Sequence, residues 1–250
     1  MRYFVVVPAA GSGRRLASSS AGLADVRKQY LEIAGRTVLE HALAPFLADA
    51  RCARVVVAIA PDDARWPVIE RSLADPRLCA VAGGVERADS VRLALAALHG
   101  TASAEAWVLV HDAARPCLSA AELSGLVTAL QLHDVGGLLA LPLADTVKRA
   151  APRAGRVSSN ALAQVDATLD REDLWRALTP QMFRFAALTE ALSLTSLAGR
   201  VPTDEAQAIE WLGLQPQLVA GDARNIKITT AVDLELAAAL LAARNSSPAG

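Results

Sequence analysis

The stretch that decides the fold is Tyr3-Phe4-Val5-Val6-Val7-Pro8-Ala9-Ala10-Gly11-Ser12-Gly13-Arg14-Arg15-Leu16. Its first five residues are aromatic or β-branched and apolar, which predicts a buried strand. The strand leads into Gly-x-Gly and two arginines. Glycines let backbone N–H groups approach an anion closely, and arginines add the charge that backbone dipoles supply only in part. By itself the stretch fits a phosphate cradle or a tight strand-to-helix turn with two solvated arginines.

Residue spacing excludes two other phosphate-binding loops. The dinucleotide fingerprint needs a third glycine where this chain has Leu16, which argues against a generic dinucleotide-binding domain. The Walker A loop needs Gly-Lys-Ser/Thr where Arg14 and Arg15 stand. Small side chains at Ala9 and Ala10 leave room for a flat ligand against the loop.

Composition limits the classes of protein to consider. The 250 residues are 53% hydrophobic and 20% charged, enough for one large domain with a sizeable core. A net charge of −1 argues against a protein that coats nucleic acid. The three separated cysteines, Cys52, Cys79 and Cys117, lack zinc-ligand spacing and suit a reducing compartment. No stretch resembles a signal peptide or a membrane span, so we expect a soluble cytoplasmic protein.

Strand-like runs alternate with helical patterns along the chain. Capping-box sequences at Thr37–Glu40, Ser119–Glu122 and Asp204–Gln207, and a weaker one at Thr230–Asp233, predict helix starts. This rhythm predicts an α/β fold with a mostly parallel sheet covered on both faces, and ligands bind such sheets at the carboxyl ends of the strands. The further predicted strands are 55–59, 78–81, 107–110, 137–141, 218–220 and 225–229.

Residues 145–170 interrupt this rhythm. Two short alternating runs flank Pro152 and Gly155 without an apolar stripe, which predicts a hairpin-like arm outside the core. Such an arm needs a partner surface, and a second protomer is the obvious candidate. We therefore expect one domain over 1–244 that carries this arm, followed by a flexible tail at 245–250.

Several polar residues could carry chemistry, and each also has a purely structural interpretation. Lys28 could close over phosphates or be a solvated surface lysine. Gly83-Gly84 could expose backbone groups to a base, with Ser90 adding a hydroxyl, or form a turn before a helix capped by Ser90. Asp112 could ligate Mg²⁺ or start a turn.

Five further positions stand out. Lys227 faces away from two isoleucines and could enter a cleft or guard a sheet edge. Thr179 before Pro180 is expected to cap a helix. Thr146 and Arg171 flank the arm and could bind the phosphate of a second substrate. His111 is expected to be a packed histidine.

In order, the motifs resemble one family. They are Pro-Ala-Ala-Gly-x-Gly-x-Arg, Lys-Gln-Tyr-Leu, Gly-Gly-x-Glu-Arg-x-x-Ser-Val, Val-His-Asp-Ala-Ala-Arg-Pro, Asp-Thr-Val-Lys, Leu-Trp-x-x-Leu-Thr-Pro-Gln-x-Phe, Thr-Asp-Glu-Ala and Asn-Ile-Lys-Ile-Thr. From Val5 to about Asp233 the chain is similar to 2-C-methyl-D-erythritol 4-phosphate cytidylyltransferases of the non-mevalonate isoprenoid pathway. Arg27 stands where the family usually has proline, and Val85 where it often has an acidic residue.

The resemblance implies a nucleotide-diphospho-sugar transferase (Rossmann-like) sheet that dimerises through the arm. It also implies a set of site residues. Those for the base and ribose of CTP are Ala9, Ala10, Gly11, Gly84, Val85 and Ser90, with Asp112 near the ribose and Mg²⁺. Those for the phosphates and catalysis are Arg15, Lys28 and Lys227. Those for methylerythritol phosphate are Thr146, Arg171 and Thr179.

The chemistry implied by the resemblance is the transfer of CMP from CTP to methylerythritol phosphate with release of pyrophosphate. Two alternatives remain open at this point. One is a cytidylyltransferase for another polyol phosphate, such as ribitol 5-phosphate, and Thr146, Arg171 and Thr179 would decide between the two substrates. The other is a nucleotide-binding regulator without activity, which loss of Lys28 or Asp112 would favour; both are present.

Overall fold

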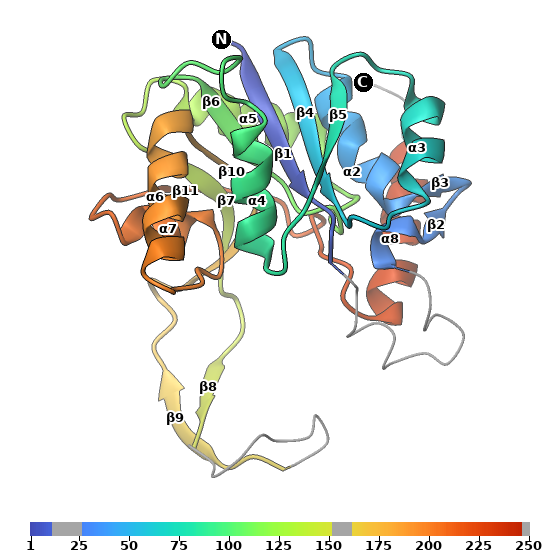
Figure 1. Ribbon diagram of the computed structural model, residues 1–250. Coiled ribbons are helices and arrows are strands. Elements are labelled where there is room, and N and C mark those ends of the chain that lie inside the picture. The colour runs from blue at the N-terminus through green and yellow to red at the C-terminus, as the bar shows by residue number, and fades with distance from the viewer. Residues whose placement is uncertain (12–26, 152–161, 247–250) are drawn as a thin grey trace.

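A computed structural model describes residues 1–11, 27–151 and 162–246 of the chain. Within these ranges the centre is a seven-stranded sheet in the order β11-β7-β10-β6-β1-β4-β5 (Figure 1). All its strands are parallel except β10, which runs antiparallel to β6 and β7. This confirms the expected mostly parallel sheet. The strands are β1 (Tyr3–Pro8), β4 (Cys52–Ile59), β5 (Leu78–Ala82), β6 (Trp107–Val110), β7 (Gly136–Pro142), β10 (Trp175–Arg184) and β11 (Gln217–Ala220).

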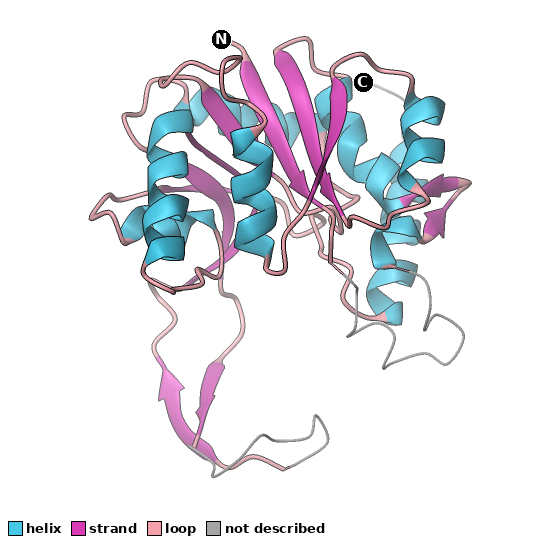
Figure 2. Cartoon of the chain, in the orientation of Figure 1, coloured by secondary structure: helices cyan, strands magenta, loops and turns pink. Residues whose placement is uncertain are grey.

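Strand β1 lies in the interior of the sheet, paired with β4 and β6. Val5, Val6 and Val7 are all fully buried, because helices cover both faces and alternate side chains enter opposite layers. One hydrophobic layer holds α2, α3 and α5, and the other holds α4, α6 and α7 (Figure 2). Their bounds are α2 (Val38–Leu47), α3 (Trp66–Leu73), α4 (Arg87–Ala96), α5 (Ala120–Leu130), α6 (Phe185–Leu197) and α7 (Glu205–Glu210).

A third hydrophobic cluster joins the two ends of the chain. The short helix η1 (Lys28–Tyr30) leads into β2 (Glu32–Ile33) and β3 (Arg36–Thr37), and these pack near the last helix, α8 (Ala231–Ser246). Leu31 and Ile33 share this cluster with Ile228 and Leu241. The segment that carries Lys28 is therefore held beside the segment that carries Lys227.

Helices begin where the capping sequences predict. The Thr37 hydroxyl accepts from the Glu40 N–H while the Glu40 carboxylate accepts from the Thr37 N–H. The same reciprocal pair starts α5, and Asp204 accepts from the backbone N–H three residues on to start α7. Each pair satisfies N–H groups that a helix start leaves without intrahelical partners.

Two local predictions and one structural alternative are wrong. Ser90 does not cap a helix, because α4 begins at Arg87 with Glu86 as its N-cap. Thr179 does not start a helix but lies inside strand β10, followed by a cis peptide bond to Pro180. Residues 225–229 run without regular structure rather than as a strand.

The arm over 145–170 is present as an antiparallel pair, β8 (Val147–Ala150) and β9 (Val165–Leu169), that projects away from the sheet (Figure 1). An ion pair joins Arg149 to Asp166 at 2.7 Å, and most of the arm is exposed. Its expected turn at Pro152 and Gly155 lies outside the described residues. Helix α8 extends two residues into the expected tail, and 247–250 also lie outside. None of the described helices combines the length and apolar character needed to cross a membrane.

Candidate functional site

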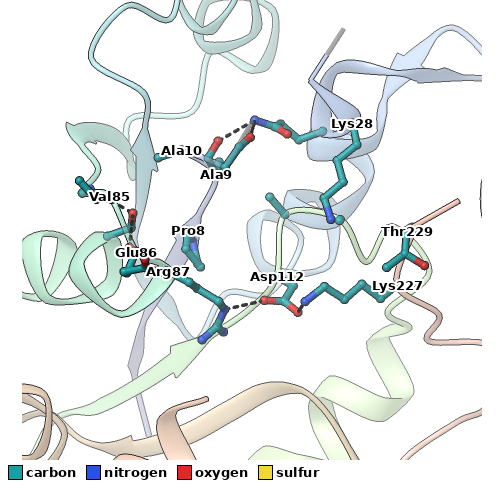
Figure 3. A pocket seen from close by; sticks show the side chains of 16 residues that line it. Pro8, Ala9, Ala10, Lys28, Val85, Glu86, Arg87, Asp112, Lys227 and Thr229 are labelled. Atoms are coloured by element: carbon teal, nitrogen blue, oxygen red, sulfur yellow. Dashed lines mark hydrogen bonds and ion pairs between the residues drawn. The ribbon is translucent and has the colours of Figure 1, made fainter. Parts of the chain in front are cut away.

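A cavity of about 480 Å³ opens at the carboxyl ends of β1 and β6 (Figure 3). This volume is in the range of small-molecule sites. Its wall comes from segments far apart in sequence, which the parallel sheet brings to one edge. The lining residues are Pro8, Ala9, Ala10 and Gly11 after β1, Lys28 and Gln29 from η1, Gly84, Val85, Glu86, Arg87 and Ser90 around the start of α4, Asp112, Ala113 and Ala114 after β6, and Lys227 and Thr229 before α8.

The loop after β1 forms an apolar part of the wall, and a buried amide fixes it. Ala9 and Ala10 present only methyl groups, and a Cβ added at Gly11 would project into open space. The side-chain Nε2 of Gln29 donates to the Ala9 carbonyl at 2.6 Å and to the Gly11 carbonyl at 3.4 Å. Gln29 is 2% exposed and was missed as a site residue, although the Lys-Gln-Tyr motif contains it. The loop therefore offers a flat face held in one conformation.

The turn between β5 and α4 needs glycine because of close approach. A Cβ on Gly83 would lie 2.5 Å from the Ala10 Cβ and 2.9 Å from the Ser90 hydroxyl. The Gly83 N–H donates to the Ile59 carbonyl, and the Gly84 N–H donates to Ser90. The idea that these N–H groups are free to read a base is thus wrong. Ser90 instead fixes the turn.

Asp112 is the electrostatic centre of the site. One carboxylate oxygen accepts from Arg87 Nε at 3.0 Å, and the other lies 2.8 Å from Lys227 Nζ and 3.5 Å from Arg115 Nε. Burial by itself would raise the pKa of Asp112, but the three cations outweigh it and hold that pKa well below the usual range of a carboxyl. Asp112 is therefore a carboxylate at any physiological pH. We call these four residues the Asp112 cluster.

Buried polar groups hold Asp112 from beneath. The Asp112 N–H donates to the Thr179 hydroxyl at 3.1 Å, and that hydroxyl lies 3.0 Å from Nδ1 of His111. His111 Nε2 faces the Arg115 carbonyl at 3.1 Å. A carbonyl only accepts, so Nε2 carries the proton and Nδ1 accepts from Thr179. Burial lowers the pKa of His111 to about 4, so the ring is neutral and packed, as expected.

The segment before α8 presents Lys227 to the cavity. Ile228 is fully buried and its N–H donates to the Ala114 carbonyl at 2.9 Å. The Asn225 side chain donates to the Thr179 carbonyl, and the Asn225 carbonyl accepts from Arg115. With its flanks held, Lys227 projects into the cavity and reaches Asp112, which is the first of the two interpretations that the sequence left open (Figure 3).

Lys28 approaches the cavity from η1, on the same side as Lys227 and opposite Val85 (Figure 3). Its Nζ donates to the Ile228 carbonyl at 3.3 Å. The preceding Arg27 pairs with Asp62 at 2.9 Å and Asp63 at 3.0 Å. The residue that departs from the family pattern thus ties the start of η1 to the loop after β4.

The structure brings together nine of the sequence-predicted site residues, and three others lie elsewhere. Thr179 is buried beneath Asp112 rather than lining the cavity. Thr146 and Arg171 are exposed at the base of the arm, where the Arg171 guanidinium donates to the Ala144 carbonyl. Arg15 lies outside the described residues. The nine are Ala9, Ala10, Gly11, Lys28, Gly84, Val85, Ser90, Asp112 and Lys227.

Comparison with known proteins identifies the family. The family model for 2-C-methyl-D-erythritol 4-phosphate cytidylyltransferase (IspD) matches residues 3–243. The chain belongs to the IspD family. A cytidylyltransferase of that name from Pseudomonas putida strain KT2440 is 50% identical over 234 residues, which cover 93% of each chain. One from Klebsiella pneumoniae is 48% identical over 93% of this chain and 90% of its own.

Solved IspD structures share the fold. A 4-diphosphocytidyl-2C-methyl-D-erythritol synthase structure is 36% identical, with a TM-score of 0.77 over 96% of this chain and 98% of its own. The Francisella tularensis IspD structure is 32% identical, with a TM-score of 0.75 over 96% of this chain and all of its own. The α/β fold and nucleotidyltransferase family expected from the motifs are therefore confirmed.

Proposed function

We propose that the chain transfers CMP from CTP to 2-C-methyl-D-erythritol 4-phosphate, giving 4-diphosphocytidyl-2-C-methyl-D-erythritol and pyrophosphate. The observation that carries this function is the division of the cavity. Small side chains and backbone form one wall, while Lys28, Arg87, Asp112 and Lys227 form another. A nucleoside triphosphate has the matching division between a flat base and a polyanion.

The reaction itself requires alignment more than proton transfer. A phosphate oxygen of the polyol phosphate forms a bond to the α-phosphorus of CTP while the bond from that phosphorus to the bridging oxygen of pyrophosphate breaks. The attacking oxygen is already ionised, so no general base is needed, in keeping with the buried neutral His111. Lys28 and Lys227 neutralise charge that grows on the α-phosphate and on the leaving group. Arg15 is proposed to join them.

We propose Mg²⁺ as the metal ion, held by Asp112 together with phosphate oxygens of CTP. Mg²⁺ takes one or two carboxylates plus substrate phosphates, and Asp112 is an ionised carboxylate that lines the cavity. Residues 1–11, 27–151 and 162–246 contain no cluster of three or more potential ligand side chains, so the donor set fits a metal that arrives with its nucleotide. When bound, the ion would neutralise charge on the phosphates. With the ion bound, Lys227 would release Asp112 and pair with a phosphate group of CTP instead.

We propose that the second substrate site is completed by another copy of the chain. Thr146 and Arg171 lie together at the base of the exposed arm and do not line the cavity of their own chain. An isolated two-stranded pair is marginally stable in water, so a partner surface for β8 and β9 would stabilise it. A homodimer would deliver both residues to a neighbouring cavity. A cytoplasmic location stays a prediction.

Pyrophosphate release with CTP tests the function and the acceptor together. We expect release with methylerythritol phosphate, loss of release on chelation of divalent cations, and recovery on adding Mg²⁺. Activity with ribitol 5-phosphate alone would overturn the acceptor, and no release with either would favour a regulatory nucleotide-binding role. Sedimentation of the full chain and of a variant lacking 146–170 tests the arm. The same number of subunits in both proteins would refute dimerisation through the arm.

A further inference from the structure

A buried ion pair behind the cavity involves a carboxylate that does not line it. Glu205 begins α7 and is 1% exposed. Its two oxygens accept from Arg87 Nη1 at 2.7 Å and Nη2 at 3.0 Å. Nε of the same guanidinium donates to Asp112 at 3.0 Å. One arginine thus joins a carboxylate on α7 to the carboxylate at the centre of the site.

The shape of the guanidinium limits what Arg87 can do. Its N–H groups form a planar fork with an end edge, Nη1 with Nη2, and a side edge, Nε with one Nη. Glu205 binds the end edge and so fixes where the guanidinium lies, and from that position Nε donates to one oxygen of Asp112. The two edges share no N–H, so it is the position of the guanidinium that matters: once released from Glu205, it could move until its side edge binds both oxygens of Asp112.

The second oxygen of Asp112 has its own partner. It lies 2.8 Å from Lys227 Nζ, on the side where Asp112 lines the cavity. A bidentate Arg87 would compete for that oxygen and turn the carboxylate away from Lys227. Burial lowers the pKa of Arg87, but the charges of Glu205 and Asp112 together raise it above the ordinary value, so the competing charge is permanent.

The start of α7 is itself fixed. Asp204 caps the helix, Gln181 Nε2 donates to Asp204 at 2.9 Å, and the Ala206 N–H donates to Gln181 Oε1 at 2.8 Å. Gln181 is 1% exposed in β10. Glu205 is therefore held by backbone and buried side chains on both sides.

We propose that Glu205 and Arg87 are positioning residues for nucleotidyl transfer. Glu205 holds the Arg87 guanidinium end-on, so that Arg87 fixes one oxygen of Asp112 and leaves the other for Lys227 or the bound ligand. Glu205 also offsets the positive charge of Arg87, which is one of the three cations of the Asp112 cluster. The inference rests on the proposed function and extends it to two residues outside the predicted set.

Glu205→Gln tests the idea with nearly unchanged volume. An amide keeps one acceptor oxygen but sets an NH₂ group and no charge against the other N–H of the fork, so Arg87 should turn to Asp112. The kcat should then fall by about 10- to 100-fold, as for partners that orient ligand-binding groups elsewhere. The matched control is Asp49→Asn, which alters another carboxylate held by an arginine fork, at the opposite end of β1. We expect Asp49→Asn to lower stability and leave kcat unchanged.

A double variant separates positioning from simple loss of structure. Arg87→Met with Glu205→Gln removes the guanidinium that would capture Asp112, so its kcat should exceed that of Glu205→Gln alone. Arg87→Lys is the second single variant, since a compact ammonium cannot reproduce the planar fork that binds Glu205 end-on and Asp112 through Nε, and its kcat should also fall. These rates are measured by pyrophosphate release well below each variant's unfolding temperature.

The outcomes are separable. A wild-type kcat in Glu205→Gln, or a double variant no faster than Glu205→Gln, overturns the positioning role while leaving the proposed function intact. If Glu205→Gln does not fold, a wild-type kcat in Arg87→Lys overturns the role instead. Absence of pyrophosphate release by the wild-type chain counts against the proposed function itself.

Discussion

His111 should make the stability of this protein depend on pH in a defined window. Burial lowers its pKa to about 4 in the folded chain from the ordinary value of 6.5. Its Nδ1 accepts from Thr179, so protonation there would take away the acceptor of the Thr179 hydroxyl beneath Asp112. Lowering the pH from about 7 to about 5 tests this dependence. His111→Gln is the comparison, because glutamine can still donate to the Arg115 carbonyl and does not titrate in this range.

The sign and size follow from proton linkage. Between its two pKa values, a histidine with a depressed folded pKa is neutral in the folded chain and charged in the unfolded chain. Its contribution to the free energy of unfolding is therefore fully present above the unfolded pKa and is lost as the pH falls toward the folded pKa. Between about pH 7 and pH 5 the loss is about 2 kcal/mol, with a ceiling of about 3 kcal/mol below both pKa values. Carboxylates with depressed pKa values, such as Asp49 at about 2, lose their contribution only at lower pH, so this window isolates the histidine.

Urea unfolding at the two pH values measures the effect. We expect the wild type to lose about 2 kcal/mol more than His111→Gln does, although the variant is less stable at neutral pH because Thr179 loses an acceptor. Equal losses in both proteins would refute the assignment of a buried neutral imidazole. So would a wild type whose stability rises as the pH falls.

Three further perturbations follow from the site. Lys28→Ala should lower kcat by about a hundredfold with an unchanged urea midpoint, measured by pyrophosphate release, and a near-normal rate would exclude a role at the phosphates. Thr179→Val leaves a buried N–H and a ring nitrogen without partners, and each should cost about 1–3 kcal/mol in the free energy of unfolding. Thr179→Ser keeps the hydroxyl and should be close to wild type. Equal urea midpoints for the two variants would show that the hydroxyl does not stabilise the fold. Gly83→Ala places a Cβ 2.5 Å from that of Ala10, so it should lower the free energy of unfolding by about 1–3 kcal/mol. It should also weaken CTP binding measured by calorimetry. Unaltered binding would show that the turn adapts to the added methyl group.

Much of the fold could be predicted because its signals are local. The valines of β1 show a buried strand without any neighbour being known, since strands covered on both faces are apolar throughout. The pair Thr37 and Glu40 marks a helix start from side chains three residues apart. These patterns need only the chain's own dihedral preferences and hydrogen bonds. They sufficed for the strand–helix alternation and hence for the sheet.

At Thr179 and Ser90 the local signal fits a helix N-cap that the structure does not have. Thr179-Pro180 fits a helix start equally well, but β10 pairs with two other strands and buries Thr179 under Asp112. Ser90 suits an N-cap, yet α4 starts earlier and Ser90 binds the Gly84 N–H. Sheet pairing and close packing decided both positions, and neither is encoded in neighbouring residues.

The sequence by itself determined the motif order and the family resemblance, and it predicted that the loop after β1 lines a ligand site. Only the tertiary structure decided that Asp112 lies among three cations and that Arg87 is held from behind by Glu205. Arg87 and Glu205 are 118 positions apart, and no periodicity connects them. The physical reason is that charges interact through space at 3 to 4 Å, and the sheet order sets which ones come that close.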